Sequence, residues 1–209
     1  MKLIECVPNF SEGRDLNTIN LISDSIESVS GITLLDVDPG ADTNRTVITF
    51  VGSPENVIEA AFIGIKQAAK IIDMRKHSGA HARMGATDVC PLVPVNGVTM
   101  EECVELSIQL AKRVGKKLGI PVYLYENSAS SPERVNLANL RSGEYEGMAD
   151  KLKIKAWKPD FGPKDLHVTA GVTAIGAREF LIAYNINLNS HEKKIASDIA
   201  LDVREAGRA

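Results

Sequence analysis

The sequence predicts an α+β fold in which helices cover one face of an antiparallel or mixed sheet. Apolar and polar residues alternate in short segments typical of strands, and apolar residues recur every three or four positions in segments typical of helices. These segments follow one another in the order strand, helix, strand, strand, helix, strand. That βαββαβ order, with an extra helix and strand after it, is typical of a ferredoxin-like α/β sandwich.

The first half of the sandwich begins with an alternating segment and a helix whose apolar residues are three or four apart. Gly31 ends this helix, and a turn then joins two apolar runs of strand type. We therefore expect a strand at 2–9, a helix from a cap at Ser11 or Asp15 to about Val29, and strands at 32–37 and 45–51 on either side of a turn at 38–40.

The second half repeats the pattern. Ser53 and the proline after it are typical of a helix start, and the apolar face of this helix runs from Val57 to Ile72. A strand is expected at 89–95. Thr99 and Glu102 form a capping box for a third helix, which we expect to reach about Leu118, and a further strand follows at 121–125.

Two parts of the chain fall outside this pattern. Residues 127–163 are rich in polar residues and glycine, and an excursion of this length is more often functional than idle. Residues 180–188 read as a strand, and Ser190 caps a helix through Val203. Because the chain also begins with a strand that leads through Asn and Ser into a helix, we expect one unit at 1–177 and the first strand and helix of a truncated second ferredoxin-like unit at 178–209.

Composition narrows the class of protein. Hydrophobic residues make up 44% of the chain and charged residues 24%, which is ordinary for a globular protein. A net charge of -3 argues against a nucleic-acid-binding protein, which needs a basic surface. No apolar run is long enough for a membrane span or a signal peptide, so no membrane partner is expected. Three cysteines without CxxC spacing fit a cytoplasmic protein.

The segment HSGAHARMGATDVCPLVP, residues 77–94, is the strongest candidate site. It joins two histidines, an arginine and an aspartate to glycines that disfavour a helix. His81 is the best general acid or base of the chain, with a structural histidine as the alternative. A metal-dependent hydrolase built on His77, His81 and Asp88 is a weaker alternative, because the glutamate of an HExxH motif is missing.

Other candidates are weaker when taken alone. Asp38 could orient a substrate amine, although an aspartate before Pro-Gly is more often a turn residue. Arg45 and Arg83 are candidate clamps for a substrate carboxylate, and Lys164 is a further cation that could draw in substrate carboxylates. Cys90, inside an apolar strand, reads as an inert thiol. The polar stretch between Gly162 and Gly171 is a weak signal for a ligand-binding loop.

A family resemblance adds what these patterns leave open. The segments ECVPNFSEG, LLDVDPGADTNRTVITFVG, HSGAHARMGATDVCPLVPV, VYLYE, PDFGP and GAREFLIAYNINL resemble the formiminotransferase family, and they cover essentially the whole chain in the family's order. The resemblance implies transfer of a formimino group from N-formimino-L-glutamate to N5 of tetrahydrofolate, a step of histidine degradation. It also implies two ferredoxin-like subdomains, with folate between them.

The resemblance also assigns residues. It places the catalytic histidine at His81, with Asp38 as its active-site partner. It implies tetrahydrofolate as co-substrate, no metal, and either a homo-oligomer such as a dimer or a second subdomain. A non-catalytic folate-binding remnant is the alternative function. The folate-binding segment falls on Gly162, Pro163, Lys164, Asp165, Leu166, His167, Val168, Thr169, Ala170 and Gly171.

Overall fold

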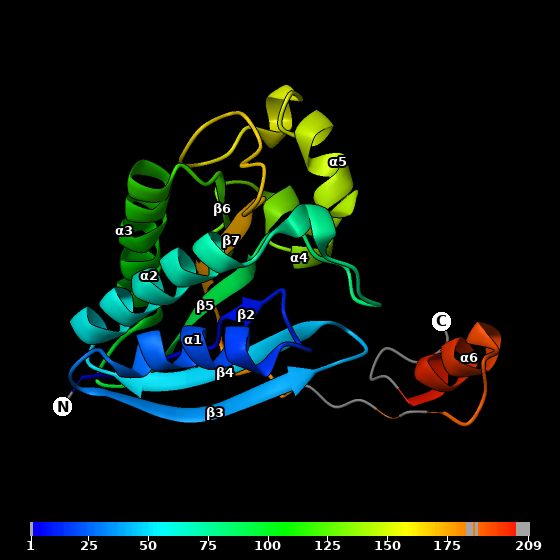
Figure 1. Cartoon of the computed structure of the whole chain (residues 1–209), viewed down its shortest axis with the longest axis horizontal. Helices are drawn as coiled ribbons and strands as arrows, with labels where there is room; N and C mark the ends of the chain where they lie inside the picture. Colours follow the sequence, from blue (N-terminus) through cyan, green and yellow to red (C-terminus); the bar gives the residue numbers. More distant parts are fainter. Residues whose placement is uncertain (1, 183–185, 187, 204–209) are drawn as a thin grey trace. The chain divides into compact units, whose positions relative to one another are not determined.

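The computed structural model describes residues 2–182, 186 and 188–203. The chain divides into two compact units, Met1–Glu179 and Phe180–Ala209. The first unit contains the sheet, all of the predicted site residues and most of the helices (Figure 1). The fold that positions the site is therefore that of the first unit.

A seven-stranded mixed sheet forms the centre of the first unit. The order across the sheet is β3, β4, then β1 and β2 end to end, then β5, β7 and β6. Pairings from β3 to β5 are antiparallel, and β7 lies parallel to both β5 and β6. The strands are β1 (Leu3–Cys6), β2 (Asn9–Phe10), β3 (Ile32–Gly40), β4 (Arg45–Gly52), β5 (Thr87–Asn96), β6 (Val122–Glu126) and β7 (Thr173–Ala177).

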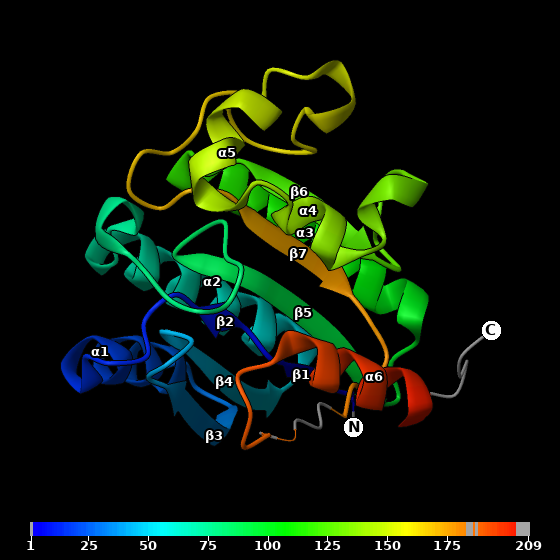
Figure 2. The same cartoon turned by 90° about the vertical axis from the view of Figure 1, so that its right-hand side faces the viewer.

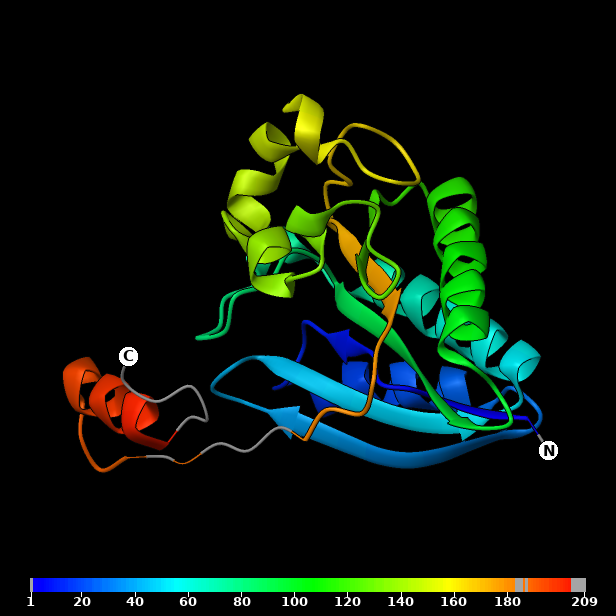
Figure 3. The same ribbon diagram turned by 180° about the vertical axis from the view of Figure 1, so that it is seen from behind.

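Three long helices cover one face of this sheet, as Figures 1 and 3 show from opposite sides. Their apolar faces share one core with the inward residues of the strands, among them Phe10, Ile48 and Phe50. No helix within the described residues is long and apolar enough to cross a membrane. The predicted α+β sandwich is thus confirmed. The three helices are α1 (Leu16–Glu27), α2 (Pro54–Ile71) and α3 (Met100–Leu118).

Local sequence signals account for the helix ends. Asp15 caps α1, which decides between the two predicted caps, and Ser53 caps α2. Thr99 and Glu102 form the predicted capping box of α3, and Gly119 ends that helix in the left-handed conformation. The predicted turn at 38–40 is wrong. Strand β3 continues to Gly40 and the chain turns at 41–44, since a proline is tolerated in an edge strand.

The excursion corrects the prediction that helices lie on one face only. Tyr123 and Tyr125 of β6 point away from α3 and are buried by Leu140, Met148 and neighbouring apolar residues. Because β5, β6 and β7 are buried on both faces, this half of the sheet needs a second cover, which Figure 2 shows. The cover consists of α4 (Leu137–Arg141), α5 (Glu144–Lys151) and the 3-10 helices η2 (Pro132–Arg134) and η3 (Lys155–Trp157).

The second unit contains one helix, α6 (Lys193–Val203), within its described residues. The strand predicted at 180–188 is not formed at 180–182, 186 or 188, and the remaining positions of that segment lie outside the described residues. Strand propensity alone is insufficient, because a strand also needs a neighbouring strand with which its backbone can pair. The assignment of 178–209 to a second subdomain stays a prediction.

Candidate functional site

The polar loop singled out in the sequence connects the 3-10 helix η1 (Met74–Lys76) to β5 and contains no regular helix. It crosses the turn between β3 and β4 so closely that a Cβ at Gly79 would lie 2.2 Å from the carbonyl oxygen of Thr43. Any side chain at position 79 would therefore push the loop off this turn. Glycine is needed here for close approach of two backbones.

Asn44 fastens the loop to the turn. It is 7% exposed and holds a left-handed backbone conformation, with φ at 49°. Its Oδ1 accepts from the backbone N–H of Gly13 at 3.0 Å, and its Nδ2 donates to the carbonyl of Ser78 at 2.9 Å. Its backbone carbonyl is 2.8 Å from Nε2 of His77. One residue thus joins the β2–α1 connection, the β3–β4 turn and the polar loop.

His81 lies half-buried in this loop. Its Nδ1 is 2.7 Å from the carbonyl oxygen of Ala82. Since a carbonyl only accepts, Nδ1 carries the proton, and Nε2 is the basic nitrogen of the neutral ring. Nη1 of Arg45 lies 3.2 Å from both ring nitrogens. Equal distances of this size place the guanidinium over the ring, so Arg45 leaves the in-plane lone pair of Nε2 accessible.

The surroundings keep His81 uncharged. Burial is the main cause that lowers the pKa of His81 from its ordinary 6.5, and the positive charges of Arg45 and Arg141 lower it further. The hydrogen bond to Ala82 and the charge of Asp88 act in the opposite direction without reversing the shift. At neutral pH the imidazole is therefore a base with a free lone pair on Nε2.

Asp38 lies on the same side of the sheet as Arg45. In the antiparallel pairing of β3 with β4, Asp38 opposes Val47 and Gly40 opposes Arg45, so both side chains project from the face opposite the helix layer. Asp38 is exposed. The sheet register therefore places Asp38 and Arg45 on one face of the sheet, and Arg45 contacts His81. These are three of the residues nominated from sequence.

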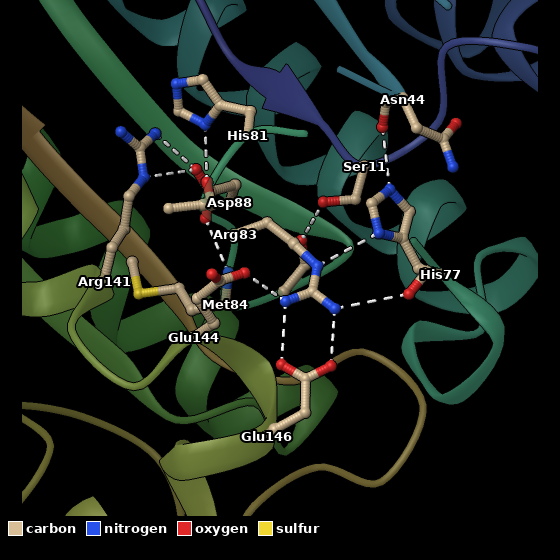
Figure 4. A network of polar contacts seen from close by, with 12 residues as sticks. Ser11, Asn44, His77, His81, Arg83, Met84, Asp88, Arg141, Glu144 and Glu146 are labelled. Carbon is tan, nitrogen blue, oxygen red and sulfur yellow. Dashed lines mark hydrogen bonds and ion pairs between the residues drawn. The ribbon is translucent and has the colours of Figure 1, made fainter. Parts of the chain in front are cut away.

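Arg83 has protein carboxylates as its partners. Arg83 is 8% exposed, and its guanidinium pairs with Glu144 and Glu146 at the start of α5, as Figure 4 shows. Its Nε donates to Nδ1 of His77 at 3.3 Å. Arg83 and His77 thus tie the polar loop to the excursion, and the guanidinium of Arg83 is already occupied by protein carboxylates.

Asp88 and Arg141 form a buried ion pair beside the polar loop (Figure 4). Asp88 is completely buried, and its Oδ1 accepts from the backbone N–H of Met84 at 2.9 Å. Its Oδ2 accepts from Nε of Arg141 at 2.8 Å and also from Nη2. A metal ion bound by His77, His81 and Asp88, the alternative considered from sequence, would require Asp88 to release Met84 and Arg141. It would also require His77 to release Asn44 and Arg83.

A cavity of about 440 Å³ opens between His81 and the start of α5. Volumes of this size are typical of sites for small molecules. The polar loop supplies one wall, and α4 with the turn into α5 supplies the other. The lining residues are His81, Ala82, Ala138, Arg141, Ser142, Gly143 and Glu144.

The segment predicted to bind folate, 162–171, begins exposed and ends against the polar loop. The backbone of Ala86 donates to the carbonyl of Ala170 at 2.9 Å, and Val172 donates to that of Met84 at 2.9 Å. Gly171 has φ at 69°, and a Cβ there would lie 2.3 Å from the Met84 carbonyl. The structure thus joins the end of this segment to the chain just after His81.

Sequence reasoning missed Asn44 and Arg141. Neither has a local motif: Asn44 acts through contacts with residues about 31 and 34 positions away, and Arg141 pairs across 53 positions. The only sequence signal was the polar character of the turn and of the excursion. Among the described residues, no group of three or more His, Cys, Asp or Glu is placed to hold a metal ion.

The family described as the formiminotransferase domain, N-terminal subdomain, matches residues 3–178. A formimidoyltransferase-cyclodeaminase of Dictyostelium discoideum is 55% identical over 207 residues, which are 99% of this chain and 38% of that protein. A glutamate formimidoyltransferase of Streptococcus pyogenes serotype M1 is 50% identical over 206 residues, 99% of this chain and 69% of that protein. A formimidoyltransferase-cyclodeaminase of Rattus norvegicus is 52% identical, again with 38% of its length covered.

Proposed function

The chain belongs to the formiminotransferase family, and on this premise we propose that it takes part in transfer of a formimino group from N-formimino-L-glutamate to N5 of tetrahydrofolate. The reaction belongs to histidine degradation and would take place in the cytoplasm. Tetrahydrofolate is a co-substrate, and the proposed chemistry needs no metal. The single observation that carries the proposal is His81, a neutral imidazole with Nδ1 fixed and Nε2 free.

In the proposed reaction N5 of tetrahydrofolate attacks the formimino carbon and a tetrahedral intermediate forms. Nε2 of His81 takes the proton that N5 releases. The bond between the formimino carbon and the glutamate nitrogen then breaks, and His81 returns the proton to that nitrogen. L-glutamate and 5-formiminotetrahydrofolate leave, and His81 is again neutral. A positioned acid–base group of this kind typically contributes about 10²–10⁴-fold in rate.

Neighbouring groups have separate roles in the proposal. Asp38, exposed on the same sheet face as Arg45, would pair with the cationic amidine of the donor. Segment 162–171 would bind folate, since its end is hydrogen-bonded to the chain that follows His81. The relatives are longer than this chain, which spans 38% or 69% of the three compared. We therefore include a second subdomain or a partner copy as a contributor to the folate site.

The test is a transfer assay with formiminoglutamate and tetrahydrofolate, in which 5-formiminotetrahydrofolate is measured. We expect His81→Ala to lower turnover by about 10²–10⁴-fold. His191→Ala, a change of an exposed histidine in the second unit, is the matched control and should keep wild-type turnover. Near-normal turnover in His81→Ala would show that the catalytic role is misassigned.

The alternative, a folate-binding chain without turnover, rests on the same difference in length from the relatives. It predicts that tetrahydrofolate binds to the 209-residue chain with no product formed. Equilibrium binding measured beside the transfer assay separates the two functions. A folded chain that neither binds folate nor forms product would exclude both.

A further inference from the structure

The cavity beside His81 contains a positively charged group that is oriented before any ligand arrives. Nε and Nη2 of Arg141 are held by the completely buried carboxylate of Asp88, and the Arg141 side chain is 14% exposed. Nη1 has no hydrogen-bond partner within the part of the chain that the structure describes, and Figure 4 shows it directed away from Asp88. A guanidinium fixed on two nitrogens and open on the third is suited to bind an anion.

The charge balance of the site also favours an anion. Arg45 and Arg141 provide two positive charges near His81, and Asp88 provides one negative charge. Arg45 forms no ion pair within residues 2–182, 186 and 188–203. Glu144, at the rim of the cavity, is already paired with Arg83. Arg45 and Arg141 are therefore the cations near His81 that a bound anion would neutralise in part.

We propose that this cavity binds the α-carboxylate of the glutamyl donor through Nη1 of Arg141, an inference that rests on the proposed function. Both substrates carry glutamyl carboxylates, and their covalent structures decide between them. In the donor, the α-carboxylate and the leaving nitrogen are attached to the same carbon. In tetrahydrofolate, the p-aminobenzoyl group separates N5 from the glutamyl tail. A carboxylate that binds in the same cavity as His81 belongs to the donor.

Carboxylate binding has a measurable consequence. A negative charge in the cavity offsets the two arginines that lower the pKa of His81, so that pKa rises when the site is filled. The charged groups around the imidazole are Arg45 on β4, Asp88 on β5 and Arg141 on α4, with Glu144 on the far wall of the cavity. The expected rise in the pKa of His81 comes from the charge of the ligand, and Arg45, Asp88 and Arg141 keep their own charges.

L-glutamate, the proposed product, is the probe, so that turnover is not needed. The pKa of His81 is followed by NMR of the imidazole in the wild-type chain with and without L-glutamate, and His81→Ala identifies the signal. We expect a saturable increase in the pKa of His81. Tetrahydropteroate, which lacks the glutamyl tail, and a tetrahydrofolate with that tail form the second pair of probes. An increase that depends on the tail of folate would overturn the assignment to the donor.

Two variants test the residues. Ala138→Leu fills the cavity from an exposed position on α4 and does not alter the Arg141–Asp88 pair, so we expect the variant to fold as the wild type does. We expect it to weaken L-glutamate binding by about tenfold or more. Arg141→Lys keeps the charge but loses the guanidinium geometry, and we expect a similar loss. Unchanged L-glutamate binding in Ala138→Leu would place the carboxylate elsewhere.

The same measurements keep this inference separate from the proposed function. Suppose that L-glutamate binds to the wild-type chain, raises the pKa of His81, and binds more weakly to the Ala138→Leu variant. The carboxylate site is then supported even in a chain without transfer activity. If the chain transfers the formimino group but L-glutamate leaves the pKa of His81 unchanged, the proposed function stands and the carboxylate site is wrong.

Discussion

Replacing Asn44 should loosen the loop that holds His81, and the cost can be worked out from its contacts. In Asn44→Ala the backbone N–H of Gly13, which is buried, loses its acceptor, at about 1–3 kcal/mol. The carbonyl of Ser78 is at an exposed residue and regains water, so this bond costs about 0.5–1.5 kcal/mol. Alanine at φ 49° adds about 1 kcal/mol. We expect a total loss of about 4 kcal/mol.

Two further variants separate these contributions. Asn44→Gly loses both side-chain hydrogen bonds but accepts the left-handed backbone, so it should be about 1 kcal/mol more stable than Asn44→Ala. Asn44→Asp keeps the acceptor for Gly13 but turns a carboxylate oxygen toward the carbonyl of Ser78, so it should recover only part of the stability lost in Asn44→Ala. The free energy of unfolding is measured by urea titration, with circular dichroism and fluorescence as independent probes.

Amide hydrogen exchange then locates the effect. Faster exchange should appear at 77–82 and near Gly13, while amides of β5 exchange as in the wild type until global unfolding. A loss below about 1 kcal/mol in Asn44→Ala, or equal stability of the Gly and Ala variants, would refute the account of Asn44 as the residue that fastens the loop.

Four other predictions rest on named contacts or on burial. In a chain that turns over, kcat/KM should fall on the acid side with an apparent pKa below 6.5, because the pKa of His81 is lowered and only the neutral ring accepts a proton; a pH profile checks this. The free energy of unfolding should also decrease as the pH falls from 6.5 through the folded-state pKa of His81, because the unfolded chain binds the proton of His81 more tightly than the folded chain does. Arg134→Met should cost about 3–5 kcal/mol by leaving Asp160 unpaired, and adding Asp160→Asn should restore part of it in urea titration. The three cysteines should resist a thiol reagent at pH 8 until urea is added, since all are buried and burial raises the pKa of Cys103 to about 11; rapid colour from the native chain would contradict this.

Helices and strands that depend on local sequence signals were predictable. Those that depend on contacts with neighbouring elements were not. The caps at Ser53 and Thr99 mark helix starts by side-chain chemistry alone. Strand β7 has the sequence TAIGA, in which two alanines and a glycine are weak strand formers, and it was missed. Parallel pairing with β5 on one side and β6 on the other stabilises it. The apolar segment at 180–188 shows the reverse case, because strong strand propensity without paired neighbours gave no strand at its described positions.

The candidate site divides in the same way. His81, Asp38 and Arg45 were nominated separately from sequence. The structure shows that Arg45 contacts His81, and that the β3–β4 register places Asp38 on the same sheet face as Arg45. Arg141 is different, because its importance comes from a buried carboxylate 53 residues earlier. An arginine in a polar excursion has no pattern that separates it from a solvated one. Only the burial of Asp88 reveals that Arg141 is fixed in place.

Two cations beside a catalytic base raise a question of function, because they make that base weaker. Arg45 and Arg141 lower the pKa of His81 and so reduce the affinity of Nε2 for a proton. In the free protein this keeps the imidazole deprotonated at neutral pH, which a general base requires. The proposed donor carboxylate would neutralise one cation when it binds, and Nε2 would become more basic just when N5 must release its proton. The net charge of -3 is no obstacle, since the charges that decide this chemistry are the few within the site.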